Sequence, residues 1–317
     1  MASRPRSRRL RRTLLAALVA ASVAVPTVGA AGPSAVPAPA PAPLGPLSFA
    51  DPGALAARYD ANRAAVRAAE VMAEAHGDRE RAATLRAMAG EDHRLLSFDG
   101  RDGGRSVEVF GDLAGATRIA VLVPGSDTRL DSHRFRSGAA ALQRERSRGT
   151  AVLAWLGYRT PATLSAAAAT PGRAEEAAPL LAAFVRELAA AAPRARLTLL
   201  CHSYGSVVCA KAADGLPVAG LVLYGSPGTG ADRAAGLGTR ATVWAGRGTD
   251  DWIAHVPHVR VSLGLGEIGF GTDPVAPRFG ARVFDAGPGG HSDYLRPGSV
   301  PLRNMARIVA GAEPTDA

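Results

Sequence analysis

The sequence is short of cysteine and of aromatic residues, and each shortage excludes a class of protein. Two cysteines in 317 residues cannot form a disulfide-rich scaffold, so a hydrophobic core has to hold the fold together. Aromatic residues make up 5% of the chain and are not interleaved with clusters of basic residues, so we expect no nucleic-acid partner. The net charge of +9 does not change this, because six arginines lie within the first twelve residues and the remainder carries only +3.

The two cysteines, Cys201 and Cys209, are expected to be free thiols. Cys201 follows a predicted strand, and Cys209 lies inside the helix predicted after it. Cysteines in such positions are usually too far apart for a disulfide bond, which constrains the separation of the two Cα atoms. A bridge is the less favoured alternative, which an exported protein would permit.

A hydrophobic run long enough to cross a bilayer is also missing from the N-terminal region. The run from Leu14 to Val25 has only twelve residues, follows a basic stretch and precedes the small-residue pattern Val28-Gly29-Ala30. We therefore predict a cleavable signal peptide over residues 1–30 and a secreted, extracellular protein without a stable membrane anchor. Arg11-Arg12 also resembles part of a twin-arginine signal, but a plain secretory signal is the favoured interpretation.

Three further regions follow the signal peptide. Six prolines, largely interleaved with alanine, predict an extended linker over residues 31–50. Residues 51–90 are rich in Ala, Leu, Arg, Glu and Met, and they predict two helices that are interrupted at residues 76–78 and pack on the main domain. Residues 91–317 alternate between strand and helix patterns, which is typical of an α/β domain.

The order of the strands predicts the architecture of this domain. The first two strands flank a turn-rich stretch and predict an antiparallel hairpin, whereas the later ones alternate with helices and predict parallel pairing. This is the order of an α/β-hydrolase fold: a mostly parallel sheet of about eight strands with helices on both faces, preceded by the helical pair. The predicted strands are Arg94–Phe98, Ser106–Phe110, Ile119–Val123, Ala151–Trp155, Leu197–Leu200, Val218–Tyr224, Ala241–Trp244 and Ala281–Phe284.

The candidate nucleophile lies after the fifth of these strands. Ser203 is at the centre of a short stretch between an apolar strand and an apolar helix, which is the context of a nucleophile elbow. The residues two before and two after such a serine must be small, because the strand and the helix pass close together. Gly205 meets this requirement, and Cys201 stands where glycine is usual. The alternative is an ordinary serine in a strand-to-loop turn.

Two backbone N–H groups are predicted to form the oxyanion hole. In this fold one comes from the residue after the nucleophile and the other from the loop after the third strand. Tyr204 follows Ser203, and Ser126 follows Pro124-Gly125 in that loop, so these two residues are the candidates. The alternative is that Pro-Gly after a strand is only a turn.

His291 is the candidate general base among the seven histidines. The chain order in this fold is serine, acid, histidine, and His291 follows the last strand in a glycine-rich loop. His202 is adjacent to the serine, and adjacent residues point apart, so it is a poor candidate. His255 and His258 follow the expected acid too closely, and we find no further ligands that would make them a metal site. The alternative for His291 is an exposed loop residue.

Several stretches between about Leu55 and Tyr294 carry a family resemblance: Asn62–Val66, Val121–Ser126, His202–Ser206, Gly271–Pro274 with Phe279–Ala281, and Gly290–Tyr294. Together they resemble an actinobacterial family of exported α/β-hydrolases that was long catalogued as a domain of unknown function. The resemblance implies a Ser-His-acid hydrolase without a metal or an organic cofactor. It does not supply a defined substrate.

Two neighbouring aspartates compete for the role of the acid. Asp250 and Asp251 both lie in the loop after the strand at Ala241–Trp244, and only one can readily reach His291 if the segment is extended. In resembling hydrolases the acid is commonly followed, two positions on, by a β-branched apolar residue, and Ile253 stands in that frame for Asp251. Asp251 is therefore our choice and Asp250 the alternative; the remoter candidates are Asp273 and Asp285.

The sequence thus predicts a secreted serine hydrolase that cleaves a carboxylic ester of a small or lipid-like molecule through an acyl-enzyme. An amide or a thioester is a less favoured substrate. Two other functions stay open: an acyltransferase with the same triad, and a non-catalytic binding protein on a hydrolase scaffold. Residues 262–272 combine four glycines with apolar residues, which predicts either a flap over the acyl pocket or an ordinary surface loop.

Overall fold

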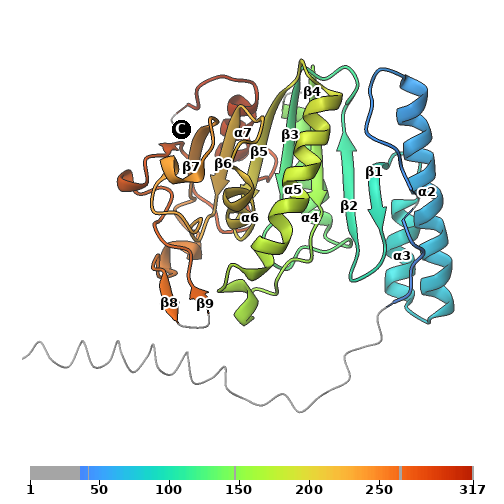
Figure 1. Ribbon diagram of the computed structural model, residues 1–317, viewed down its shortest axis with the longest axis horizontal. Coiled ribbons are helices and arrows are strands. Elements are labelled where there is room, and N and C mark those ends of the chain that lie inside the picture. Colours follow the sequence, from blue (N-terminus) through green and yellow to red (C-terminus); the bar gives the residue numbers. More distant parts are fainter. Residues whose placement is uncertain (1–35, 42, 146–147, 264–265, 316–317) are drawn as a thin grey trace, which may run out of the picture. The chain divides into compact units, whose positions relative to one another are not determined.

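The computed structural model describes residues 36–315, apart from residues 42, 146–147 and 264–265 (Figure 1). The predicted signal peptide and the first residues of the predicted linker lie outside the described residues. No helix in the described part of the chain has both the length and the apolar character needed to cross a membrane.

Eight strands form one sheet in the spatial order β1-β2-β4-β3-β5-β6-β7-β10. The pairs β1–β2 and β2–β4 are antiparallel, and all the other neighbouring pairs are parallel. The predicted α/β-hydrolase order is therefore confirmed. The strands are β1 Arg94–Asp99, β2 Arg105–Phe110, β3 Arg118–Val123, β4 Thr150–Leu156, β5 Arg196–His202, β6 Gly220–Tyr224, β7 Thr242–Gly246 and β10 Arg282–Val283.

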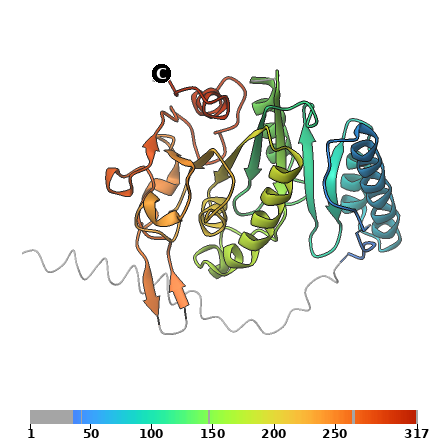
Figure 2. The same cartoon turned by 45° about the horizontal axis from the view of Figure 1, so that its top comes forward.

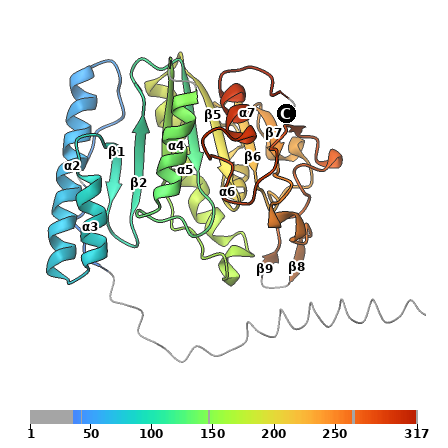
Figure 3. The same cartoon turned by 180° about the vertical axis from the view of Figure 1, so that it is seen from behind.

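The central strands are apolar along almost their whole length because helices cover both faces of the sheet. From Ile119 to Val123, every residue of β3 is 0% exposed. Helices α5 (Gly172–Ala191) and α6 (Gly205–Ala212) cover one face, while α4 (His133–Glu145) and α7 (Val300–Val309) cover the other (Figures 1 and 3). Three apolar clusters form the described core, and two of them lie one on each face of the sheet.

The N-terminal helices α2 (Pro52–Ala75) and α3 (Arg79–Met88) pack beside β1 at the antiparallel edge of the sheet (Figure 1). Asp78 caps α3 by accepting a hydrogen bond from the backbone N–H of Arg81 at 2.9 Å. Buried Asn62 connects α2 to the sheet, because its Nδ2 donates to the carbonyl of Leu95 at 2.9 Å. The pair thus shares a core with the sheet.

Strands β8 (Val261–Leu263) and β9 (Gly266–Ile268) form a separate antiparallel hairpin. The hairpin extends from the body of the molecule and does not join the main sheet (Figure 2). It overlaps the segment 262–272, for which the sequence predicted a flap or a surface loop.

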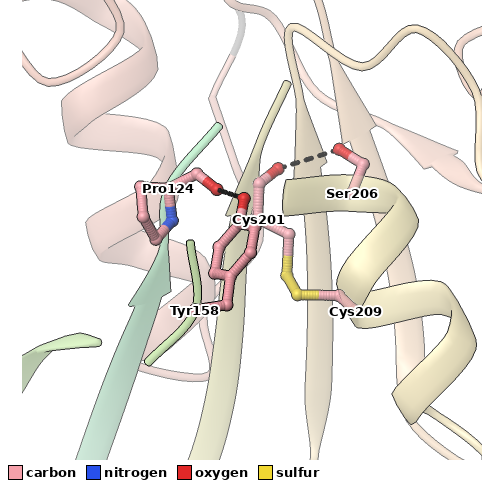
Figure 4. The surroundings of a disulfide bond; sticks show 5 residues. All are labelled: Pro124, Tyr158, Cys201, Ser206 and Cys209. Carbon is pink, nitrogen blue, oxygen red and sulfur yellow. Dashed lines mark hydrogen bonds between the residues drawn. A yellow bond between two sulfur atoms is a disulfide. The ribbon is translucent and has the colours of Figure 1, made fainter. Parts of the chain in front are cut away.

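Cys201 and Cys209 form a disulfide bond, so the prediction of free thiols is wrong (Figure 4). Their Cα atoms lie 6.4 Å apart, which a disulfide can span. The physical reason is the sharp turn at Ser203: α6 begins only two residues later and folds back against β5. Cys209, on the second turn of this helix, therefore faces the end of the strand.

Candidate active site

Ser203 occupies a strained turn between β5 and α6. Its φ is +51°, in the left-handed region that residues other than glycine rarely adopt. The turn is held by a hydrogen bond from the Ser203 N–H to the Tyr224 carbonyl at 3.0 Å and by one from the Ser206 N–H to the Ser203 carbonyl at 2.9 Å. Such strain persists only where the surrounding structure enforces it, and this turn is the geometry of a nucleophile elbow.

The small residues around this turn are required by close contacts. A Cβ atom on Gly205 would lie 2.6 Å from the carbonyl oxygens of Val123 and Pro124, and one on Gly125 would lie 2.6 Å from the Cβ of Ser203. Cys201 is accommodated at the usual glycine position because its side chain lies between β5 and α6, bonded to Cys209 (Figure 4).

The three residues predicted as a triad lie in hydrogen-bond contact. The Ser203 hydroxyl and the Nε2 of His291 are 2.8 Å apart. The Nδ1 of the same ring lies 2.9 Å and 3.0 Å from the two carboxylate oxygens of Asp251. A carboxylate can only accept here, so Nδ1 carries a hydrogen, and the neutral ring has Nε2 free to accept the serine proton.

Asp251 is enclosed by donors and is only 1% exposed. Besides His291, the hydroxyl of Tyr294 donates to it at 2.5 Å and the N–H of Ile253 at 2.9 Å. Burial by itself would raise the pKa of Asp251, but the hydrogen bonds from His291, Tyr294 and Ile253 together lower it below the ordinary value of an aspartate. The carboxylate is therefore ionised at neutral pH.

The other candidate acids do not contact His291. Asp250 is exposed, and its carboxylate accepts from the Thr249 hydroxyl at 3.4 Å. Asp273 pairs with Arg247 at 2.5 Å, and Asp285 accepts from the Gly287 N–H at 2.7 Å. Among the candidates named from the sequence, the geometry brings only Asp251 to the base.

Three residues with aromatic rings, which the sequence analysis did not assign to the site, contact His291 or Asp251. The rings of His202 and Trp252 each lie 4.7 Å from the His291 ring, centroid to centroid. Tyr294 positions Asp251, because its hydroxyl donates to the carboxylate and accepts from the Gly248 N–H at 3.0 Å. The available signal for Tyr294 was its place in the motif Gly290–Tyr294, three residues after the predicted base in the chain.

The predicted oxyanion groups lie next to the nucleophile. Ser126 lines the same cavity as Ser203, and Tyr204 is the next residue along the turn. Within the described part of the chain, neither backbone N–H donates a hydrogen bond. Two unsatisfied N–H groups beside a nucleophilic oxygen are available to a developing oxyanion.

A cavity of about 660 Å³ opens at Ser203 and His291. Its walls come mainly from the loops after β3, β4 and β7 and from the loop that carries His291. The apolar part of the lining consists of Pro124, Phe135, Leu164, Tyr224, Trp252, Tyr294 and Leu295. None of the described residues of segment 262–272 lines it, so their placement favours a surface loop over a flap.

His258, one of the two histidines considered for a metal site, lies in contacts outside the triad. His258 donates from Nδ1 to the Pro227 carbonyl at 3.0 Å, and its Nε2 lies 3.6 Å from the Asp273 carboxylate. Within the described residues, no three His, Cys, Asp or Glu side chains are grouped in a way that could hold a metal ion.

Comparison with known proteins identifies a family for this chain. Residues 99–261, just over half of the chain, match the alpha/beta hydrolase family. The uncharacterized protein Rv2079 of Mycobacterium tuberculosis (strain ATCC 25618 / H37Rv) is 31% identical over 257 residues, an alignment that covers 68% of this chain and 38% of that protein. The chain therefore spans well under half the length of that relative.

A second relative and a solved structure are also similar. The uncharacterized protein Mb0988c of Mycobacterium bovis (strain ATCC BAA-935 / AF2122/97) is 34% identical over 187 residues, covering 51% of this chain and 70% of that protein. The crystal structure of esterase PE8 is 18% identical and covers 65% of this chain and 98% of its own, with a TM-score of 0.46. Because the family match over residues 99–261 covers more than half of the chain, the chain belongs to the alpha/beta hydrolase family.

Proposed function

We propose that the protein is a serine esterase that cleaves a carboxylic ester through an acyl-enzyme. The observation that carries the proposal is the continuous hydrogen-bond chain from the Ser203 hydroxyl through both nitrogens of His291 to the Asp251 carboxylate. In this arrangement the imidazole can take the serine proton, and the carboxylate holds the required tautomer and stabilises the imidazolium that forms. The intact contacts speak against a non-catalytic binding protein on this scaffold.

The reaction proceeds in two halves. The Oγ of Ser203 attacks the ester carbonyl while its proton moves to the Nε2 of His291, and the N–H groups of Ser126 and Tyr204 receive the oxyanion. The carbon–oxygen bond to the alcohol then breaks, and His291 returns the proton to the leaving alkoxide. In the second half, water attacks the acyl-serine, giving its proton to His291, and the carboxylic acid leaves as Ser203 regains its hydrogen.

The shape and lining of the cavity favour an ester with an apolar acyl or alcohol group. A volume of about 660 Å³ lies within the usual range for small-molecule sites. Phe135, Trp252 and Leu295 are among the apolar side chains that would remove such a group from water. The substrate class is therefore a small-molecule or lipid-like ester.

A fluorophosphonate probe tests the proposed nucleophile directly. We expect one covalent adduct per chain and, after proteolysis, its location on Ser203, because this serine alone bonds to His291 among the described residues. Pre-incubation with an ester substrate should slow the labelling, and heat-denatured protein should not be labelled. An adduct on another serine would contradict the assignment. Products formed with an added alcohol then separate hydrolysis from acyl transfer.

We also propose that the protein is exported. The proposal is supported by the signal pattern of residues 1–30 and by the Cys201–Cys209 disulfide, because such bonds persist in oxidising compartments. The mature chain is expected to begin near Ala31, since cleavage should follow Val28-Gly29-Ala30. N-terminal sequencing of protein from the culture medium checks this. Protein that retains Met1 and stays in the cytoplasm would show the prediction to be wrong.

A further inference from the structure

A second imidazole, which the mechanism above does not use, lies against the base. His202 comes directly before the nucleophile, and its Nε2 lies 2.8 Å from the backbone carbonyl oxygen of His291. A carbonyl only accepts, so His202 donates from Nε2. Its ring also packs against Tyr224 at 5.0 Å and Tyr294 at 5.8 Å, centroid to centroid.

His202 is a fixed neutral donor and not a second base. Burial and, after it, the neighbouring His291 ring lower the pKa of His202 from 6.5 to about 3. The side chain therefore stays uncharged throughout the pH range in which an esterase works. A neutral ring beside His291 adds no positive charge that would oppose formation of the imidazolium.

Two described hydrogen bonds join the turn at residues 202–205 to the loop 287–294. One is the bond between Ser203 and His291; the other is the bond from His202 to the His291 carbonyl. The first bond exists only while the serine oxygen carries its hydrogen. Once Ser203 is acylated, its Oγ belongs to an ester and no longer donates to the imidazole, so only the His202 bond remains.

The structure assigns to His202 the role of a positioning residue that holds the His291 loop at the elbow while Ser203 carries the acyl group, and so serves deacylation more than acylation. This inference rests on the proposed acyl-enzyme mechanism. During deacylation the Nε2 of His291 takes a proton from water while the water oxygen attacks the acyl carbon. The imidazole then keeps its hydrogen bonds to Asp251 but has none to the elbow that carries the acyl group. A displacement of about 1 Å between base and acyl group can cost about a hundredfold in rate.

A matched pair of variants separates the hydrogen bond from the bulk of the ring. His202→Leu introduces an apolar side chain of similar size and removes the donor, whereas His202→Gln retains an N–H donor. Stopped-flow measurements with a p-nitrophenyl ester give the acylation constant from the burst and the deacylation constant from the steady state. Mass spectrometry measures the acyl group on Ser203, and circular dichroism with thermal melting checks the fold.

For His202→Leu we expect deacylation to slow by about ten- to a hundredfold while acylation changes by less than about threefold. Then kcat and KM fall together, kcat/KM stays nearly constant, and acylated Ser203 accumulates. His202→Gln should recover a large part of the deacylation rate. The difference between the effects on deacylation and on acylation should be the same from about pH 6 to 9, because the pKa of His202 lies far below this range.

Equal slowing of both steps, or no recovery with glutamine, would overturn the role of His202. If the difference between the effects on the two steps varied with pH, the role would also be overturned, because His202 would then act by gaining or losing a proton. Wild-type protein that forms no acyl-enzyme on Ser203 would instead refute the proposed function. The two failures are therefore distinguishable.

Discussion

Replacing Ser203 by alanine is expected to lower kcat for ester hydrolysis by at least about ten-thousand-fold and to abolish fluorophosphonate labelling. The serine oxygen forms the covalent bond in the proposed mechanism, and loss of the nucleophile in a serine protease costs about a millionfold in kcat. The melting temperature should stay almost unchanged, because alanine fits the same space and meets the same backbone strain at φ +51°. Ester turnover and thermal melting measure the two effects.

Ser292→Ala is the matched control for this variant. Ser292 lines the same cavity and is next to the base, but its side chain takes no part in the hydrogen-bond chain. We expect it to keep turnover within about threefold of the wild type, as an exposed position without a special contact allows. If Ser203→Ala retained labelling and turnover, the nucleophile would lie elsewhere in the chain.

Changing Asp251 to asparagine is expected to lower kcat by at least about a hundredfold. The equivalent change in a serine protease costs about ten-thousand-fold, because the charge that holds the imidazole in its working tautomer is lost. Asp251 also accepts from Tyr294 and Ile253, and an asparagine nitrogen placed there would leave one of these buried donors without an acceptor. We therefore also expect a loss of about 1–3 kcal/mol in unfolding free energy.

Asp250→Asn provides the comparison one residue away. Asp250 is exposed and does not contact His291, so this variant should remain close to wild type in both activity and stability. Steady-state kinetics on an activated ester decide which aspartate is the acid, and circular dichroism checks the fold of both variants. A large loss of activity in Asp250→Asn, together with nearly normal activity in Asp251→Asn, would reverse the assignment of the acid.

The pH dependence of stability gives an independent check on Asp251. Its pKa is lowered in the folded state, so the stabilisation from its ionised form is present above the unfolded value near pH 4 and is lost as pH falls through the folded value. The Asp251→Asn variant cannot lose this contribution. Its melting temperature should therefore fall less steeply than that of the wild type as the pH is lowered from about 4.

Local patterns in the sequence determined the fold and the main residues of the site. Apolar runs bounded by turns marked the strands, and their alternation with helices implied a parallel sheet, because parallel strands need crossover connections. In such a sheet, residues that follow different strands meet at one edge. The motif around Ser203, the late position of His291 and the loop after β7 could therefore be read in chain order as parts of one site.

The choice of Asp251 over Asp250 rested on the frame set by Ile253, and the contacts in the structure agree with it. Both aspartates share a loop and a chemistry, so the sequence could favour one only through a neighbouring residue. Tertiary packing separates them, since one carboxylate is enclosed by donors and the other faces solvent. A pattern of residue types does not encode such a difference in burial.

Only the tertiary structure decided the features that depend on distances between segments. The Cys201–Cys209 bridge forms because the turn at Ser203 folds α6 back against β5, and an average strand-to-helix spacing does not predict that approach. His202 was set aside as a neighbour of the nucleophile, yet its ring packs on His291, which is 89 residues away in the chain. The walls of the cavity likewise come from several loops, and their meeting is a property of packing, which a linear pattern does not contain.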